Sequence, residues 1–196
     1  MRPTAEVRWF LRGPLPEAVV RWFEAAAGAR AWEVRTDRYV RTEATDLGVK
    51  TREGGVEVKR REALLEEARF TEEAAGRVER WRKWRFALAE EAAPETDDWV
   101  AVHKRRLNRP FAVDAAGVRP VEVEVDAVQG CSLEVSEVQV AGAAWWSVCF
   151  EAWGADEAAL PDVLRRAAAH AFACGAPPAL PPARAMGYPA WLAREG

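Results

Sequence analysis

Apolar and polar residues alternate with a period of two through much of residues 4–153, a pattern that is typical of β-strands. Glycine, proline and short polar stretches interrupt the alternation and mark the breaks between strands. The pattern predicts nine strands, at residues 4–11, 31–39, 49–52, 56–61, 77–88, 99–107, 121–128, 132–140 and 145–153. Such a run of short strands with few helices predicts an α+β fold built on an antiparallel barrel of about eight strands.

Two segments instead repeat apolar residues at helical spacing. Residues 17–29 follow Pro16, and residues 160–173 end just before Gly175. Proline is favoured in the first turn of a helix, and glycine is favoured just beyond its end. We therefore expect two helices, both packed outside the barrel.

The remaining segments carry weaker patterns. Residues 64–75 have a helix-forming composition but no clear period, and they predict a helix or an irregular crossover. Four prolines within residues 177–182 argue against regular structure there, whereas the apolar residues 188–192 are expected to dock on the body of the protein as a plug. We expect one domain over 1–196, made of a barrel at about 4–153 and a C-terminal helix with a proline-rich tail at 155–196.

The composition gives no reason to expect nucleic acid or a membrane as a partner. The net charge is -3 at pH 7, so positive charge is not in excess, and no nucleic-acid-binding motif is present. No apolar stretch reaches the roughly 20 residues that a membrane-spanning helix needs. The three cysteines lack CxxC spacing and predict free thiols. We expect a cytoplasmic protein, and its oligomeric state stays open.

Charged residues recur two positions apart within several predicted strands, so they share one face of each strand. The residues that follow this pattern are Lys50, Arg52, Glu57, Lys59, Arg61, Lys83, Arg85, Lys104 and Arg106. They either face solvent or line the interior of the barrel. The residues on the opposite face around Lys83 and Lys104 are also polar or aromatic and cannot all form an apolar core. This favours a charged interior, although the pattern alone does not decide the question.

The order of these segments resembles the CYTH superfamily, also called triphosphate tunnel metalloenzymes. The segments that carry the resemblance are Glu-Val-Arg at 6–8, Asp-Arg-Tyr-Val at 37–40, Leu-Gly-Val-Lys-Thr-Arg at 47–52, Val-Glu-Val-Lys at 56–59 and Val-His-Lys-Arg-Arg at 102–106. The resemblance covers about residues 4–153. It implies a tunnel of eight antiparallel strands in which Arg and Lys hold a triphosphate and Glu side chains hold divalent cations.

The resemblance also implies roles for particular residues of this chain. The substrate-binding residues are expected to be Arg8, Lys50, Arg52, Lys59, Lys83, Arg85, Lys104 and Arg106. The catalytic and metal-binding residues are expected to be Glu6, Glu134 and Glu151, with Glu57 in support. Mg²⁺ or Mn²⁺ would be the cofactor of a catalytic tunnel, because these ions take hard oxygen ligands and can position water for attack on phosphorus.

Two departures from the family pattern affect the acidic motifs. The family's opening ExExK motif is Thr4, Glu6 and Arg8 in this chain. Its late ExE motif is Glu134 followed by Ser136. Each motif therefore lacks one carboxylate.

These departures leave two functions open. Either Glu57 and Glu151 compensate, and the chain is a metal-dependent triphosphatase, or the tunnel binds a polyphosphate or nucleotide without turnover. A barrel for apolar ligands is a third class, and the basic positions argue against it. The most informative observation is whether one enclosed cavity contains the side chains of Lys50, Lys59, Lys83 and Lys104.

Overall fold

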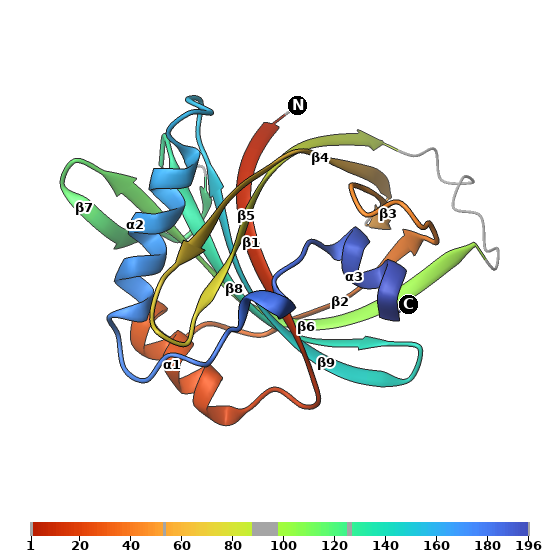
Figure 1. The fold of residues 1–196 in the computed structure, drawn as a ribbon, viewed down its shortest axis with the longest axis horizontal. Coiled ribbons are helices and arrows are strands. Elements are labelled where there is room, and N and C mark those ends of the chain that lie inside the picture. The colour runs from red at the N-terminus through yellow and green to blue at the C-terminus, as the bar shows by residue number, and fades with distance from the viewer. Residues whose placement is uncertain (1, 53, 88–97, 125–126, 196) are drawn as a thin grey trace.

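A computed structural model describes residues 2–52, 54–87, 98–124 and 127–195. Eight strands pair in the order β2-β3-β4-β5-β1-β9-β8-β6, and β6 pairs again with β2, so the sheet closes into a barrel (Figure 1). All the pairings between these strands are antiparallel, which confirms the predicted barrel. A ninth strand, β7, pairs with β6 outside the ring.

The bounds of these elements are as follows. The strands are β1 (Arg2–Arg12), β2 (Glu33–Val40), β3 (Leu47–Arg52), β4 (Gly55–Arg69), β5 (Ala75–Ala87), β6 (Trp99–Asp114), β7 (Gly117–Pro120), β8 (Gly130–Val140) and β9 (Ala143–Trp153). The helices are α1 (Glu17–Ala27), α2 (Leu160–Phe172), the 3₁₀ turn η2 (Pro182–Arg184) and α3 (Tyr188–Glu195). No helix of the described residues is long and apolar enough to cross a membrane.

Two predicted elements were wrong. Residues 64–75 form neither a helix nor a crossover, because β4 runs on to Arg69 and a tight turn leads into β5. Two register shifts in the β4–β5 pair interrupt the alternation there, which explains why the strand pattern was missed. Residues 121–124 and 127–128 are not strand either, since β7 ends at Pro120. The predicted end of the fifth strand at residue 88 lies outside the described residues.

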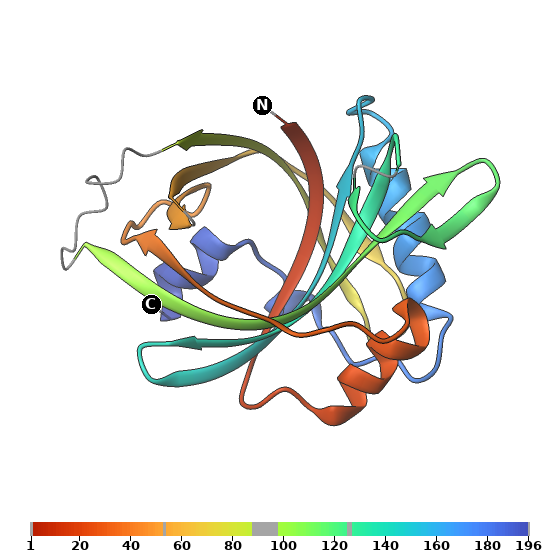
Figure 2. The same ribbon diagram turned by 180° about the vertical axis from the view of Figure 1, so that it is seen from behind.

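Helices α1 and α2 cover the outer face of the wall formed by β1, β9, β8 and β6 (Figure 2). Trp22 of α1 is fully buried and donates a hydrogen bond of 3.0 Å from Nε1 to the carbonyl oxygen of Ala171 in α2. The wall contributes the outward-facing Trp9, Leu133 and Phe150 to the same core. This outer core leaves the inward face of these strands free for polar side chains.

The C-terminal segment reaches α3 by passing beside β1. Ala185 forms a bridge with Trp9, and the Met186 amide donates a 2.8 Å hydrogen bond to the carbonyl oxygen of Arg8. Gly76 allows this close approach, because a Cβ there would meet Ala185 and Trp9 at 2.9 Å. The proline-rich stretch that precedes Ala185 is less irregular than expected. It contains the 3₁₀ turn η2, and Leu180 forms a β-bridge with Ala74, the residue just before β5.

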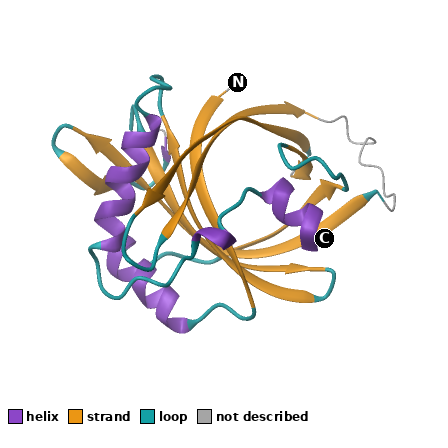
Figure 3. Ribbon diagram, in the orientation of Figure 1, coloured by secondary structure: helices purple, strands orange, loops and turns teal. Residues whose placement is uncertain are grey.

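Helix α3 lies at one end of the barrel, next to β3 (Figure 3). Trp191 stacks on Phe10 with ring centroids 4.3 Å apart and meets Trp145 edge-on at 5.6 Å. Tyr188 stacks on Tyr39 at 5.3 Å. Phe10, Tyr39 and Trp145 all face the interior, so the aromatic residues of α3 close this end of the barrel in the way expected of a plug.

Candidate functional site

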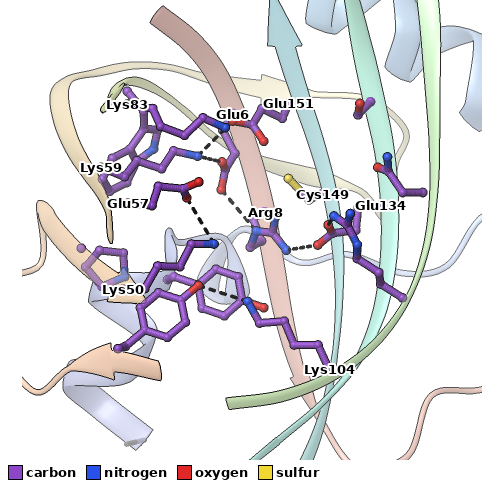
Figure 4. A pocket seen from close by; sticks show the side chains of 18 of the residues that line it. Glu6, Arg8, Lys50, Glu57, Lys59, Lys83, Lys104, Glu134, Cys149 and Glu151 are labelled. Atoms are coloured by element: carbon purple, nitrogen blue, oxygen red, sulfur yellow. Dashed lines mark hydrogen bonds and ion pairs between the residues drawn. The ribbon is translucent and has the colours of Figure 1, made fainter. Parts of the chain in front are cut away.

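The interior of the barrel contains a partly open cavity of about 230 Å³ (Figure 4). Successive residues of a strand point to opposite faces of the sheet. Because Trp9 and Phe150 point outward into the core beneath the helices, the residues next to them in sequence point into the barrel. The charged side chains that line the cavity are Glu6, Arg8, Arg35, Lys50, Glu57, Lys59, Lys83, Lys104, Arg106, Glu124, Glu134 and Glu151. Every strand of the ring contributes at least one of them, and Glu124 comes from the segment before β8.

The four lysines of the chain, Lys50, Lys59, Lys83 and Lys104, all line this one cavity. The chain has 28 Lys and Arg residues in total, so lysine is used only here while arginine supplies the rest. A lysine ammonium is a compact point charge on a flexible stem. This convergence places the basic faces of the strands on the inside of the barrel rather than on its surface.

The structure brings most of the predicted site residues together, with two exceptions. Six of the eight predicted anion-binding residues and all four predicted carboxylates line the cavity. Arg85 has the inward parity of Lys83, but its side chain is exposed near the end of β5. The side chain of Arg52 lies outside the described part of the structure.

Arg8 lies at the centre of the first ion-pair network. Its Nη1 is 2.8 Å from Glu134 Oε1, and its Nε is 3.2 Å from Glu6 Oε1. Arg106 Nη1 binds the other oxygen of Glu134 at 2.8 Å, and the Ser136 hydroxyl donates to Glu134 at 3.1 Å. Burial opposes ionisation of Glu134, but Arg8 and Arg106 outweigh it and hold the pKa of that carboxyl well below its usual value.

Lys59 joins two carboxylates on neighbouring strands. It binds Glu6 closely and lies 3.2 Å from Glu151 Oε1. Burial opposes the charged forms on both sides, yet the attraction prevails, so the pKa of Lys59 is raised and that of Glu151 is lowered. The ring of Trp81 lies 5.5 Å from the ammonium and adds a cation–π contact.

A third network surrounds Asp37, whose side chain is completely buried. Lys104 Nζ lies 2.6 Å from Asp37 Oδ2, Lys50 Nζ lies 3.4 Å from the same oxygen, and Arg35 Nε lies 3.4 Å from Oδ1. Burial alone would raise the pKa of Asp37, but Lys104 and Lys50 lower it below its usual range. Burial and Lys50 lower the pKa of Lys104, while its short bond to Asp37 favours the ammonium form. One carboxylate thus serves three cations.

The lining carries seven basic and five acidic side chains, an excess of two positive charges. Most of the basic groups already hold carboxylates, so the interior is largely neutralised from within. Lys83 differs, because it makes no ion pair with any other described residue. Its charge lowers the pKa values of Glu57 and Glu151 from a distance. This effect is smaller than the opposing effect of burial, and smaller than that of Lys50 on Glu57 and of Lys59 on Glu151. Lys83 is therefore available to an incoming anion.

The predicted metal ligands do not form a metal site in this arrangement. Each of Glu6, Glu134 and Glu151 directs oxygen atoms at lysine or arginine. Within residues 2–52, 54–87, 98–124 and 127–195, no group of three His, Cys, Asp or Glu side chains is placed to hold a metal ion. Mg²⁺ needs near-octahedral oxygen ligands, and a carboxylate already engaged by ammonium or guanidinium groups is a poor ligand for it. The residues present do not fit a preformed Mg²⁺ or Mn²⁺ site.

The sequence analysis missed several residues in or beside the cavity, among them Glu124 and Asp37. Glu79 lies on the inward face of β5 with Trp81 and Lys83, and its carboxylate forms an ion pair with Arg61 at 2.8 Å. Burial is the main cause that raises the pKa of Glu79, and the nearby charge of Glu6 adds to it. Arg35 lies two residues before Asp37, so parity could have identified both Glu79 and Arg35. Tyr188 lines the cavity from α3, which no strand pattern could have revealed.

Comparison with known proteins adds no function to this description. No family model, no curated protein and no solved structure matches the chain. The resemblance to triphosphate tunnel proteins rests on the quoted segments of this sequence.

Proposed function

We propose that the barrel binds a compact polyanion of the triphosphate type and holds it without hydrolysing it. The observation that carries this proposal is the convergence of all four lysines on one cavity, together with Arg8, Arg35 and Arg106. Phosphoryl oxygens are good partners for these groups, since arginine binds them in a bidentate way and lysine binds them as a point charge.

The size and charge of the cavity favour a small, highly charged ligand. Its 230 Å³ lies below the range of roughly 300–1,000 Å³ typical of sites for drug-sized ligands. An inorganic triphosphate or pyrophosphate suits that volume better than a whole nucleotide does. Its oxygens would reach Lys83, which lacks an ion pair among the described residues, and would compete with carboxylates for the other cations.

The side chains of the cavity favour binding over turnover. Phosphoryl transfer depends on positioned charges and an oriented nucleophile. The carboxylates that would hold a metal or activate water are bound to Arg8, Lys59 and Arg106 instead. Cys149 also lines the cavity, but burial raises the pKa of its thiol, so it stays protonated and is a weak nucleophile.

A thermal-shift titration with tripolyphosphate in EDTA tests the binding. A ligand at about 100 times its Kd adds about 2.7 kcal/mol of stability, which for a chain of this size raises Tm by roughly 5–10 °C. Sulfate at the same ionic strength is the control, and it should shift Tm much less. Equal shifts with both salts, or none with either, would remove the proposed site.

A phosphate-release assay tests the absence of hydrolysis. With Mg²⁺ or Mn²⁺ present, we expect no release from tripolyphosphate above a protein-free control. Release that depends on the metal and stops with chelator would instead make the chain a metal-dependent triphosphatase. In that case Glu6, Glu134 and Glu151 would have to leave their basic partners during the reaction.

A further inference from the structure

The plugged end of the cavity contains polar atoms that have no hydrogen-bond partner among the described residues. They are Arg35 Nη1 and Tyr188 Oη; Arg35 Nε and Asp37 Oδ1 also lack a hydrogen bond, but they face each other at 3.4 Å as an ion pair. Arg35 and Tyr188 line the cavity, and the Arg35 side chain is 14% exposed. Buried polar groups without partners are rare in folded proteins, because each loses its hydration without compensation. The cluster therefore indicates a place that a ligand or ordered water completes.

The groups around this point favour an anion as that ligand. Lys104 Nζ lies 3.9 Å from the Tyr188 ring centroid, and Lys50 and Arg35 approach the same carboxylate of Asp37. Burial raises the pKa of Tyr188, so its hydroxyl keeps its proton and can donate it. Arg35 Nη1 and Tyr188 Oη thus lie beside Lys50 and Lys104, the two other cations that share the Asp37 carboxylate with Arg35. An oxyanion supplies the acceptors that this arrangement lacks.

We propose that Arg35 and Tyr188 form the deep subsite of the tunnel, where one terminal phosphoryl group of the bound anion accepts a hydrogen bond from each. This inference rests on the proposed function and assigns it two residues outside the expected set. It also has a mechanical consequence, because Tyr188 is the first residue of α3 and Arg35 belongs to β2. The bound anion would link the plug to the barrel wall.

The present contacts of α3 show what this link would add. Tyr188 packs on Phe10 and Tyr39, and its ring contacts the cationic groups of Arg8 and Lys104. No ion pair joins α3 to the barrel among the described residues. An anion held by both Tyr188 and Arg35 would give the Tyr188 hydroxyl the hydrogen bond that it lacks among the described residues. Ligand binding should then reduce the opening of α3 away from the barrel.

Calorimetric titration of tripolyphosphate into two variants tests the subsite. Tyr188→Phe removes only the hydroxyl, and we expect it to weaken binding about tenfold. Arg35→Gln removes a charged donor and should weaken binding about tenfold to a hundredfold. Arg105→Gln is the charge control, since Arg105 is exposed and pairs with Glu137 on the outer face, and its Kd should equal that of the wild type.

Hydrogen exchange of the α3 amides separates a ligand contact from a structural effect. In the wild type, tripolyphosphate should slow exchange in α3, and in Tyr188→Phe it should not, with both free proteins exchanging alike. If the wild type binds and both variants bind equally well, the subsite is wrong and the proposed function stands. If the wild type itself does not bind tripolyphosphate, both the subsite and the proposed function fail.

Discussion

Replacing Arg8 by Gln is expected to lower the free energy of unfolding by about 3–5 kcal/mol, the loss typical of breaking a buried ion pair from one side. The Arg8 side chain is 7% exposed and bonds Glu134 and Glu6. Its guanidinium also lies 4.9 Å from the Tyr188 ring. Without it, Lys59 and Arg106 are left to balance Glu6, Glu134 and Glu151, so the buried network keeps one uncompensated negative charge. Denaturant unfolding at pH 7 measures the change.

Arg12→Gln is the matched control for Arg8→Gln. Arg12 lies on the same strand and the same face, four residues on, but its side chain is exposed and its contact is a cation–π approach to Trp145 at 5.7 Å. A surface change of this kind typically stays within about 0.5 kcal/mol. Equal stability of Arg8→Gln and Arg12→Gln would mean that the internal ion pairs do not hold the barrel.

A similarly large effect is expected for Trp191→Ala, at about 3–5 kcal/mol. Trp191 is 1% exposed, stacks on Phe10 and meets Trp145 edge-on. Its removal leaves a hole at the closed end of the barrel and exposes apolar residues that face inward. We expect lower denaturant resistance and faster hydrogen exchange throughout α3.

Trp84→Ala controls for the loss of a tryptophan side chain as such. Trp84 is only partly buried, on the outer face of β5 that α1 and α2 leave uncovered. Its replacement should cost less than half as much and leave exchange in α3 unchanged. If Trp191→Ala is no worse than Trp84→Ala, α3 is not the plug that closes the barrel.

The barrel and the charged face of each strand could be predicted from the sequence because both follow from local alternation, whereas alternation left open whether that face lies inside or outside the barrel. Parity grouped each of Lys50, Lys59, Lys83 and Lys104 with the other charged residues of its own strand, and the closed sheet brings the four lysines together inside. The same reasoning failed at residues 64–75, where register shifts break the alternation of β4. A strand pattern is readable only where pairing is regular.

The partners of each charge could not be predicted from the sequence. Glu134 lies between Arg8 and Arg106 because β8 is one strand away from β6 and two strands away from β1 in the ring. That order is a property of the whole fold, and it turns expected metal ligands into partners of basic residues. Tyr188 was missed for a similar reason, because a distant C-terminal segment carries it into the cavity.

Calorimetric titration of tripolyphosphate in EDTA, with one variant inside the barrel and one outside, tests the central claim most directly. Lys83→Gln removes a cavity cation that has no ion pair among the described residues, so folding should be unaffected while binding weakens about tenfold. Arg60→Gln removes a charge from an exposed residue that follows Lys59 and points away from the cavity. We expect one anion per chain in the wild type and in Arg60→Gln with equal affinity. Absence of binding in the wild type, or a loss with Arg60→Gln and none with Lys83→Gln, would contradict an anion site inside the barrel.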